Sequence, residues 1–306
     1  MSMGVATASS NAHCANLKPD AACDEWARRG ECDNNPRFMR EFCKRSCGLC
    51  NANFAADDTQ QVNVDASGHQ QLPPSRNVFA VPAGQIHVIF RRALEEFDDL
   101  EPTLLANTTF PVLQFDKFLQ TDDEMTALLQ LGEDAGFVDS QMQGDTSMQQ
   151  WRTSASALCA LPAESAADSL VLADIFDRAS KVTRVPLANF ERTQVVRYEP
   201  GQYYKLHLDQ FDELNAQPGG PRVFTLLIFL NDVDDKAGGE TVFKYAGDGG
   251  GFLIVRPRQG RALLWPNTLD ADPMARELKA MHAGGPLKQG VKFAINQWIR
   301  QRPVTS

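Results

Sequence analysis

Apolar positions follow two different patterns along the chain, and the pattern changes near Pro186. Over 85–100, apolar residues recur every three or four positions, which predicts an amphipathic helix. A second helix is predicted to begin at Thr121, because Glu124 follows three residues later and completes a capping box. A third helix is predicted over 166–181. The first half of the chain therefore supplies helices that need a partner for their apolar faces.

After Pro186, short apolar or alternating runs are separated by Gly, Pro, Asn and Asp, which is typical of antiparallel strands. The run Val223–Leu230 is apolar at nearly every position, so we expect a strand buried on both faces. The predicted fold class is mainly β with flanking helices (α+β), with helices packed on a sandwich or barrel. The predicted strands are 190–198, 203–209, 222–230, 240–243, 252–255, 261–265 and 291–300.

The last predicted strand has one apolar face, made by Val291, Phe293, Ile295 and Ile299. Its other face carries Lys292, Asn296, Trp298 and Arg300. A lysine, a tryptophan and an arginine on one face indicate either a solvated surface or a polar pocket.

Six of the seven cysteines lie between residues 14 and 50. A segment this short buries too little apolar surface to fold without staples. Zinc is the competing use of clustered cysteines, but Cys43, Cys47 and Cys50 have no second CxxC or close histidine pair to complete a site. We therefore expect three disulfides, with 15 pairings open, and we expect Cys159 to be a buried thiol without a partner.

Disulfides imply an oxidising compartment. Residues 1–13 show neither the basic nor the apolar region of a signal peptide. We expect the secretory pathway, with the endoplasmic reticulum lumen as the site, and a leader or anchor that is absent from this chain.

The net charge of −9 over 306 residues argues against non-specific binding to nucleic acid or anionic membranes. No apolar run approaches the roughly 18 residues of a membrane-spanning helix. The expected organisation is a disulfide module over 14–50, a polar linker over 51–78, a helical extension over 79–104 and a main domain over 105–303.

His207 and Asp209 stand two apart in a predicted strand, so both side chains project from the same face. An imidazole and a carboxylate are two ligands of a 2-His-1-carboxylate iron site, which leaves positions open for substrate and oxygen. The third ligand must come from another strand, and His282 is the candidate, at the end of a glycine-rich loop before the last strand. A His-x-Asp pair by itself usually consists of two polar residues on the protein surface. Its combination with His282 in a region of many predicted strands favours a metal site.

Several segments resemble the prolyl 4-hydroxylases among the iron(II)/2-oxoglutarate dioxygenases, and the resemblance extends from about Pro111 to Arg300. The segments are Gln194–Asp209, Arg222–Leu226, Gly238–Phe243, His282 with Lys292 ten residues later, and Arg152-Thr153-Ser154. The N-terminal segment is similar to the ShK-toxin-like domain in cysteine spacing and in its ending Cys43–Cys50. That second resemblance implies a small helical module with bridges Cys14–Cys50, Cys23–Cys43 and Cys32–Cys47.

The first resemblance implies a double-stranded β-helix (jelly roll) that holds Fe(II) on His207, Asp209 and His282. Lys292 would pair with the distal carboxylate of 2-oxoglutarate, and Tyr198 would add a hydrogen bond. O2 is the other co-substrate, and ascorbate keeps the iron reduced. The implied reaction is the hydroxylation of peptidyl proline to 4-hydroxyproline, with succinate and CO2 as co-products.

The resemblance also bears on the reaction and the substrate. Asp209 favours hydroxylation, because relatives that halogenate lack this carboxylate, and Lys292 fits prolyl 4-hydroxylases better than lysyl hydroxylases. The implied substrate groove contains Glu191, Tyr204, Arg222 and Trp298. Arg300 departs from the histidine of several relatives, so the peptide preference stays open.

The expected partner is a proline-rich protein or peptide, and the oligomeric state stays open. Two other functions are compatible with the sequence. One is an oxygenase of the same fold that acts on another residue or on a small molecule. The other is a catalytically inert secreted binding protein, a reading that the loss of a metal ligand would have favoured.

Overall fold

The computed structural model describes residues 23–24, 27–28, 32, 45–47, 79–106, 110–140, 151–159 and 167–304. By its internal contacts the chain divides into two compact units, 1–73 and 74–306. The linker expected over 51–78 lies outside the described residues.

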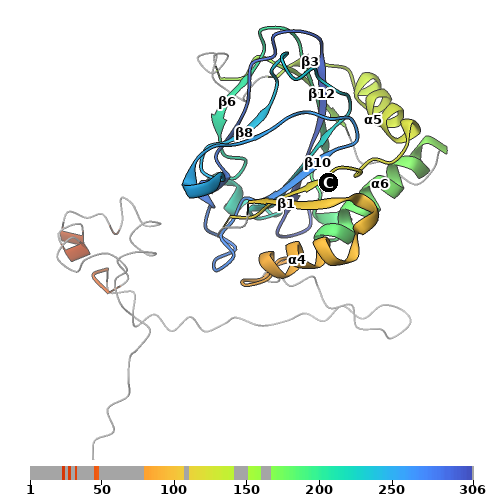
Figure 1. Cartoon of the computed structure of the whole chain (residues 1–306). Helices are drawn as coiled ribbons and strands as arrows, with labels where there is room; N and C mark the ends of the chain where they lie inside the picture. Colours follow the sequence, from red (N-terminus) through yellow and green to blue (C-terminus); the bar gives the residue numbers. More distant parts are fainter. Residues whose placement is uncertain are drawn as a thin grey trace, which may run out of the picture. The chain divides into compact units, whose positions relative to one another are not determined.

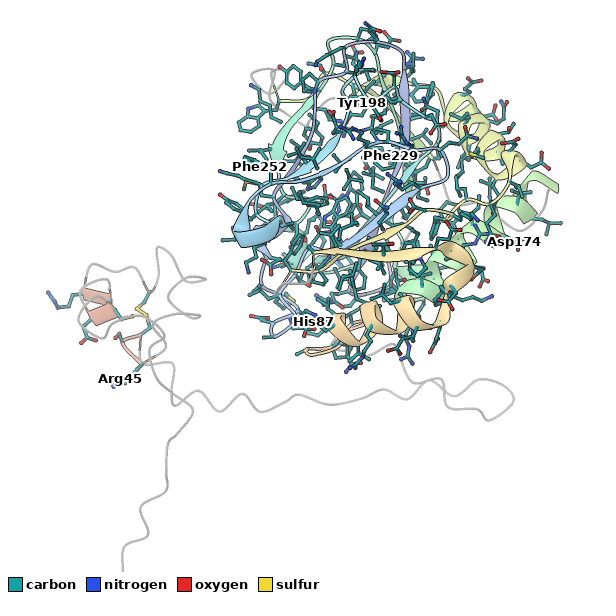
Figure 2. All side chains as sticks on the ribbon, viewed as in Figure 1. Arg45, His87, Asp174, Tyr198, Phe229 and Phe252 are labelled. Atoms are coloured by element: carbon teal, nitrogen blue, oxygen red, sulfur yellow. A yellow bond between two sulfur atoms is a disulfide. The ribbon has the colours of Figure 1, made fainter. Side chains whose placement is uncertain are left out.

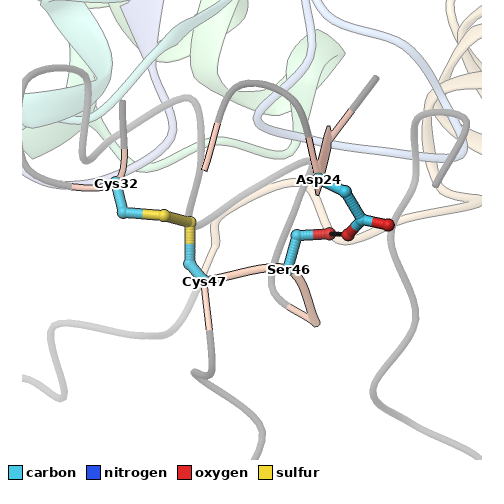
Figure 3. Close-up of a disulfide and its surroundings, with 4 residues drawn as sticks. All are labelled: Asp24, Cys32, Ser46 and Cys47. Atoms are coloured by element: carbon cyan, nitrogen blue, oxygen red, sulfur yellow. Dashed lines mark hydrogen bonds between the residues drawn. A yellow bond between two sulfur atoms is a disulfide. The ribbon is translucent and has the colours of Figure 1, made fainter. Parts of the chain in front are cut away.

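The N-terminal unit contains a disulfide between Cys32 and Cys47 (Figure 3), as the ShK-like resemblance implied. Beside it, the Ser46 hydroxyl donates a hydrogen bond of 2.6 Å to Oδ1 of Asp24. Cys23 is also disulfide-bonded. The other two implied bridges involve Cys14, Cys50 and Cys43, which lie outside the described residues, so those two pairings stay predictions.

Three helices of the larger unit lie on one side of its strands (Figure 1). The helix predicted over 85–100 is confirmed, with a 3₁₀ turn at Asp98–Leu100 as its continuation. The capping box is also confirmed, because the Thr121 hydroxyl accepts from the Glu124 amide and the Glu124 carboxylate accepts from the Thr121 amide. The helices are α4 Ile86–Glu96, α5 Asp122–Ala135 and α6 Ala167–Thr183.

The large sheet has eight strands, and every neighbouring pair in it is antiparallel. Its centre is β7, which is buried along seven of its eight residues, as predicted for this run. In spatial order the strands are β1 Pro102–Ala106, β2 Val112–Phe115, β10 Ala262–Pro266, β7 Arg222–Phe229, β12 Lys292–Arg300, β5 Thr193–Tyr198, β4 Ala155–Cys159 and β3 Val138–Asp139.

The small sheet has four short antiparallel strands. In spatial order they are β6 Tyr204–His207, β11 His282–Gly284, β8 Thr241–Phe243 and β9 Leu253–Val255. β6 and β8 lie on the side of the molecule away from the helices (Figure 1).

Two apolar clusters hold these three layers together. One joins the helices to the large sheet and contains Phe90, Ile175 and Val195. The other fills the space between the two sheets and contains Val196 and Phe243. Val195 and Val196 contribute to opposite clusters because successive residues of a strand point to opposite faces. The result is the jelly roll with flanking helices that the sequence implied.

The strand prediction was incomplete in two places. β1 to β4 fall in a region predicted to be helical or irregular, and β1 begins within the expected helical extension over 79–104. The third ligand was expected from another strand, which is confirmed, but no strand was predicted at His282, which begins β11 and pairs with β6 and β8. β3 and β11 have only two and three residues, fewer than the four to eight over which alternation indicates a strand.

Cys159, at the end of β4, is buried and carries a free thiol, as expected. Its Sγ lies 3.3 Å from the carbonyl oxygen of Leu131 on α5. Burial raises the pKa of this thiol, so Cys159 is a poor nucleophile at neutral pH.

Candidate active site

His207 and His282 face each other across the β6–β11 pair, where their Cα atoms are register partners. Asp209 lies just beyond the end of β6. One ligand atom from each of the three side chains lies within 4.8 Å of the others. The structure thus brings together the three residues that the sequence singled out, although His282 is distant from the other two along the chain.

Both imidazoles are oriented by the backbone. Nδ1 of His207 lies 2.8 Å from the carbonyl oxygen of Lys205, and Nδ1 of His282 lies 2.9 Å from that of Ala280. A carbonyl only accepts hydrogen bonds, so Nδ1 carries the proton in each ring and Nε2 is free to coordinate. The Nε2 atoms point to Asp209, at 3.6 Å for His207 and 3.8 Å for His282.

Asp209 is buried and anchored from the large sheet. Its Oδ2 accepts a hydrogen bond of 2.7 Å from the Thr225 hydroxyl, which accepts one of 2.8 Å from Nδ2 of Asn267. Burial raises the pKa of Asp209, but the neighbouring His282 and His207 outweigh it and hold that pKa well below its usual range. The carboxylate is therefore ionised and fixed in orientation.

The donor set fits a divalent iron ion. Burial and the neighbouring His207 lower the pKa of His282 to about 4, so this imidazole is neutral at pH 7. Neutral imidazole nitrogen and ionised carboxylate oxygen are the ligands of 2-His-1-carboxylate iron sites. Within the described residues, this is the one group of three or more His, Cys, Asp or Glu side chains arranged to hold a metal.

Lys292 is a buried cation, with 4% of its surface exposed. Its Nζ donates to the carbonyl oxygen of Gly239 at 2.7 Å and lies 5.3 Å from the ring centres of Tyr198 and Phe229. Both residues, labelled in Figure 2, are buried. Burial lowers the pKa of Lys292 to about 8, although Glu240 opposes the shift.

No carboxylate of the described residues lies within ion-pair distance of this ammonium group, and a buried ammonium without a counter-ion is costly. Lys292 and the three candidate ligands line the same pocket. This pocket therefore combines a metal-binding donor set with a cation that requires an anionic partner. Its other described walls include Tyr198, Leu227, Trp265, Ala294 and Asn296.

Three of the residues expected in a substrate groove form one cluster. Arg222 makes a bidentate pair with Glu191, with two N–O distances of 2.7 Å, and its guanidinium carbon lies 3.8 Å from the ring centre of Trp298. Nη1 of Arg222 also donates to the backbone oxygen of Asp209 at 3.1 Å. The cluster therefore contacts the candidate metal centre through the backbone.

Tyr204, the fourth expected groove residue, lies apart from that cluster. Its ring stacks on His207 with centroids 3.5 Å apart, and the Arg152 guanidinium lies 4.8 Å from the centre of the Tyr204 ring. Burial raises the pKa of Tyr204 to about 12, so its hydroxyl stays protonated. Contact of these four residues with a peptide stays a prediction.

Sequence reasoning missed Thr225, Asn267 and Trp265. Thr225 is the one hydroxyl-bearing residue in the apolar run 223–230, which is a signal that a polar partner lies opposite it. The ring of Trp265 packs edge-on against His282, with centroids 4.9 Å apart. Asn267 and Trp265 carried no comparable signal in the sequence.

Comparison with known proteins agrees with this geometry. Residues 193–300, which include the three candidate ligands and Lys292, match the 2OG-Fe(II) oxygenase superfamily. The chain carries a 2OG-Fe(II) oxygenase domain. Residues 11–50 match the ShK domain-like family, so an ShK-like domain precedes the oxygenase domain.

Curated relatives of the oxygenase domain are prolyl 4-hydroxylases. Prolyl 4-hydroxylase 1 of Arabidopsis thaliana is 40% identical over 144 residues, which is 43% of this chain and 48% of that protein. Probable prolyl 4-hydroxylase 10 of the same plant is 38% identical over 145 residues, which is 42% of this chain and 48% of that protein. The chain thus spans about half the length of the curated relatives it matches.

Solved structures similar to the chain include the viral collagen prolyl hydroxylase of Paramecium Bursaria Chlorella virus-1 in its 2OG complex. It is 28% identical, with a TM-score of 0.46, and the match covers 62% of this chain and 95% of that one. A prolyl hydroxylase from Trichoplax adhaerens, in complex with a hypoxia inducible factor peptide fragment, is 16% identical. Its TM-score is 0.48, and the match covers 71% of this chain and 92% of that one.

Among the described residues, we find no helix with the length and apolar character needed to cross a membrane.

Proposed function

We propose that the oxygenase domain hydroxylates peptidyl proline to 4-hydroxyproline. One molecule each of 2-oxoglutarate and O2 is consumed, one oxygen atom enters the proline and the other enters succinate, and CO2 is released. The observation that carries the proposal is the shared pocket of the three candidate ligands and the buried Lys292. The names of the curated relatives support proline as the residue that is modified.

In this proposal, His207, Asp209 and His282 would hold Fe(II), which supplies the activation of O2 that no side chain provides. The two Nδ1 hydrogen bonds to backbone carbonyls keep the coordinating Nε2 atoms aimed at one point. Thr225 keeps the Asp209 carboxylate in place. These contacts fix the ligand geometry before the metal binds.

Lys292 would bind the distal carboxylate of 2-oxoglutarate through a charge-assisted hydrogen bond. The Tyr198 ring lies beside the ammonium and lines the same pocket, and its hydroxyl would add a second hydrogen bond. Because the ammonium is buried, a monocarboxylate would leave it unpaired. Leu227 and Ala294 give the pocket apolar walls that exclude water from the reacting groups.

The peptide would enter beside Arg222 and Trp298, which contact each other, and Arg222 also donates to the backbone oxygen of Asp209. Tyr204, which stacks on His207 and lines the pocket of the centre, would also contact it. A protonated Tyr204 hydroxyl is a hydrogen-bond donor that an extended peptide backbone is able to use.

The test is an anaerobic titration of the whole chain with Fe(II) and 2-oxoglutarate, followed by the metal-to-ligand charge-transfer band in the visible. The band is expected in the parent protein, absent in His207→Ala and weakened in Lys292→Ala. The control variants are His87→Ala and Lys288→Ala, which change the same residue types at exposed positions. Absence of the band in folded, iron-loaded protein would overturn the oxygenase function.

Proline-rich peptides are then screened for succinate release and for a mass gain of one oxygen atom on proline. Succinate release that depends on another substrate, with no change in any peptide, would favour an oxygenase of the same fold with a different target. Omission of ascorbate is expected to slow the reaction over successive turnovers, because this reductant would restore iron oxidised in unproductive cycles.

We also propose that the chain works in an oxidising compartment, with the endoplasmic reticulum lumen as its site. The Cys32–Cys47 disulfide supports this, because structural disulfides form and persist in such compartments. Labelling of the freshly isolated protein with iodoacetamide is expected to modify Cys32 and Cys47 only after reduction. Labelling of both without a reductant would contradict the proposal.

A further inference from the structure

A second pocket, of about 310 Å³, lies at the other end of β12 from Lys292. Its described walls include Leu158, Glu191, Arg192, Gln217, Gly219 and Arg300. None of these residues lines the pocket of the candidate metal centre. The two pockets are therefore separate, and β12 contributes residues to both.

This second pocket is positively charged. Arg300 is buried with 4% of its surface exposed, and Arg192 is exposed beside it. The one carboxylate among the described lining residues is Glu191, and it already accepts from Arg300 at 2.9 Å and from Arg222. The described lining residues thus carry two guanidinium groups and one carboxylate, in a chain whose net charge is −9.

The Arg300 guanidinium is held in place by the protein itself and supplies positive charge to the pocket. Its Nη2 donates to the side-chain oxygen of Gln217 at 3.1 Å and to the carbonyl oxygen of Leu214 at 3.3 Å. Its Nε has no hydrogen-bond partner in the part of the chain that the structure describes. This Nε is buried, and a Cβ at Gly219 would lie only 3.0 Å from it, so the glycine lets the backbone pack closely against the guanidinium. The exposed guanidinium of the pocket is that of Arg192, whose Nη2 donates to the carbonyl oxygen of Leu158 at 2.7 Å.

The pocket lies within reach of a peptide bound at the metal centre. Asn296 lines the metal pocket and Arg300 lines the second pocket, and four residues of strand span roughly 13 Å. An extended peptide covers that distance in three or four residues at about 3.3 Å each. Arg222 connects the two regions, because it contacts both the backbone of Asp209 and the carboxylate of Glu191.

We propose that this pocket binds the carboxylate of an Asp or Glu side chain located three or four residues from the target proline. The inference rests on the proposed function, since it places the target proline at the metal centre. Guanidinium groups suit this ligand because they bind carboxylates through paired, charge-assisted hydrogen bonds. The substrate class is thus an acidic, proline-containing peptide.

The test uses two labelled peptides with a single proline, one with Glu three and four residues to either side and one with Gln at the same places. Their dissociation constants are measured with the whole chain by fluorescence anisotropy. The Glu peptide is expected to bind about tenfold more tightly, and the difference is expected to shrink as salt is added. In Arg192→Gln, the preference is expected to fall to about twofold.

Arg91→Gln is the matched control, because it removes the same charge from an exposed position on α4, outside the pocket. It is expected to keep the tenfold preference. Arg300→Gln, if its unfolding midpoint shows a folded protein, is expected to lose the preference as well. Equal binding of both peptides by the parent protein would overturn the inference, and so would a preference that survives in Arg192→Gln.

Hydroxylation of the same peptides is followed by mass spectrometry, so that the two proposals fail separately. A preference in binding without hydroxylation of either peptide would retain the pocket and overturn the proposed function. Hydroxylation of both peptides, with equal dissociation constants, would retain the proposed function and overturn the pocket.

Discussion

Thr225 shows how a single hydroxyl connects the candidate metal centre to the middle of the large sheet. Its Oγ1 donates to Asp209 and accepts from Asn267, so one side chain fixes the carboxylate and is itself fixed. All three residues are buried, and water does not replace a lost partner there. The orientation of the carboxylate therefore depends on this short chain of hydrogen bonds.

Thr225→Val is expected to weaken Fe(II) binding by about 10- to 100-fold, because Asp209 loses the donor that holds it. Valine has the same shape, so the protein should fold with a loss of about 1–3 kcal/mol in the free energy of unfolding. Thr225→Ser keeps the hydroxyl and is expected to bind iron like the parent. Equal metal affinity in Thr225→Val, measured by anaerobic titration, would contradict this role.

Lys292 makes 2-oxoglutarate binding depend on pH. Its pKa is lowered to about 8, so the ammonium is present below pH 8 and is progressively lost above it. The co-substrate carboxylates are ionised throughout this range, so affinity should be high and nearly constant below pH 8. It is expected to fall by up to tenfold per pH unit above.

Calorimetry with Mn(II) as a redox-inert metal, between pH 6.5 and 9.5, measures this dependence. Lys292→Met removes the titrating group and is expected to bind the co-substrate weakly, with a flat profile over the same range. A parent profile without a decrease above pH 8 would show that Lys292 is not the group that binds the distal carboxylate.

At the scale of elements, α5 packs against β5 at a distance that only glycine allows. A Cβ at Gly132 would lie 2.8 Å from Cγ1 and 2.9 Å from Cβ of Val195, which is a stiff, β-branched side chain of β5. Glycine at position 132 therefore lowers the helix propensity of α5 but allows close contact between helix and sheet.

Gly132→Ala is expected to lower the free energy of unfolding by about 1–3 kcal/mol, despite the better helix propensity of alanine. In Gly132→Ala combined with Val195→Ala, the loss is expected to be smaller than the sum of the two single losses, because the second change makes room for the first. Chemical denaturation of the four proteins measures these terms. Additive losses would show that the two residues do not press on each other.

The elements also show how far the sequence predicts the fold. The helix α4, the capping box of α5 and the buried strand β7 followed from periodicity and capping, which are local signals. β11 was missed because it spans only His282–Gly284, and its last residue and the next are both glycines, which resemble a loop. Its strand character comes from pairing with β6 and β8, which no local pattern encodes.

The candidate site divides in the same way. The metal ligands and Lys292 were named from spacing and resemblance, and the structure brings them to one pocket. Asn267 and Trp265 were not named, because their role depends on which strands lie side by side. β10 lies beside β7, so Trp265 becomes the register partner of Thr225. Which strands lie next to each other is determined by the tertiary structure and not by local sequence.

At the scale of the whole molecule, the disulfides and the candidate metal centre belong to different compact units. Within the described residues of the larger unit, Cys159 is the one cysteine, and it is a free thiol. No disulfide therefore stabilises the described part of the larger unit. The short cysteine-rich segment, in contrast, is expected to need its disulfides to fold, because a chain of this length buries too little apolar surface.

Reduction of the disulfides is therefore expected to unfold the ShK-like domain and to leave the charge-transfer band with iron and 2-oxoglutarate unchanged. The measurement combines near-ultraviolet circular dichroism, before and after treatment with a phosphine reductant, with the anaerobic titration. Loss of the band on reduction would show that the two units are energetically coupled.

The pairing of His207 with His282 has a consequence for the order in which the protein becomes rigid. β6 and β11 contribute only four and three residues to the small sheet, so their amides have few ladder bonds to protect them from exchange with solvent. A metal bound to both histidines would close the loop of chain between residues 207 and 282. It would bind only when β6 and β11 are paired, so it stabilises that paired state. Metal loading should therefore slow hydrogen–deuterium exchange in the small sheet far more than in the large one, which makes the small sheet the part of the fold that the cofactor completes.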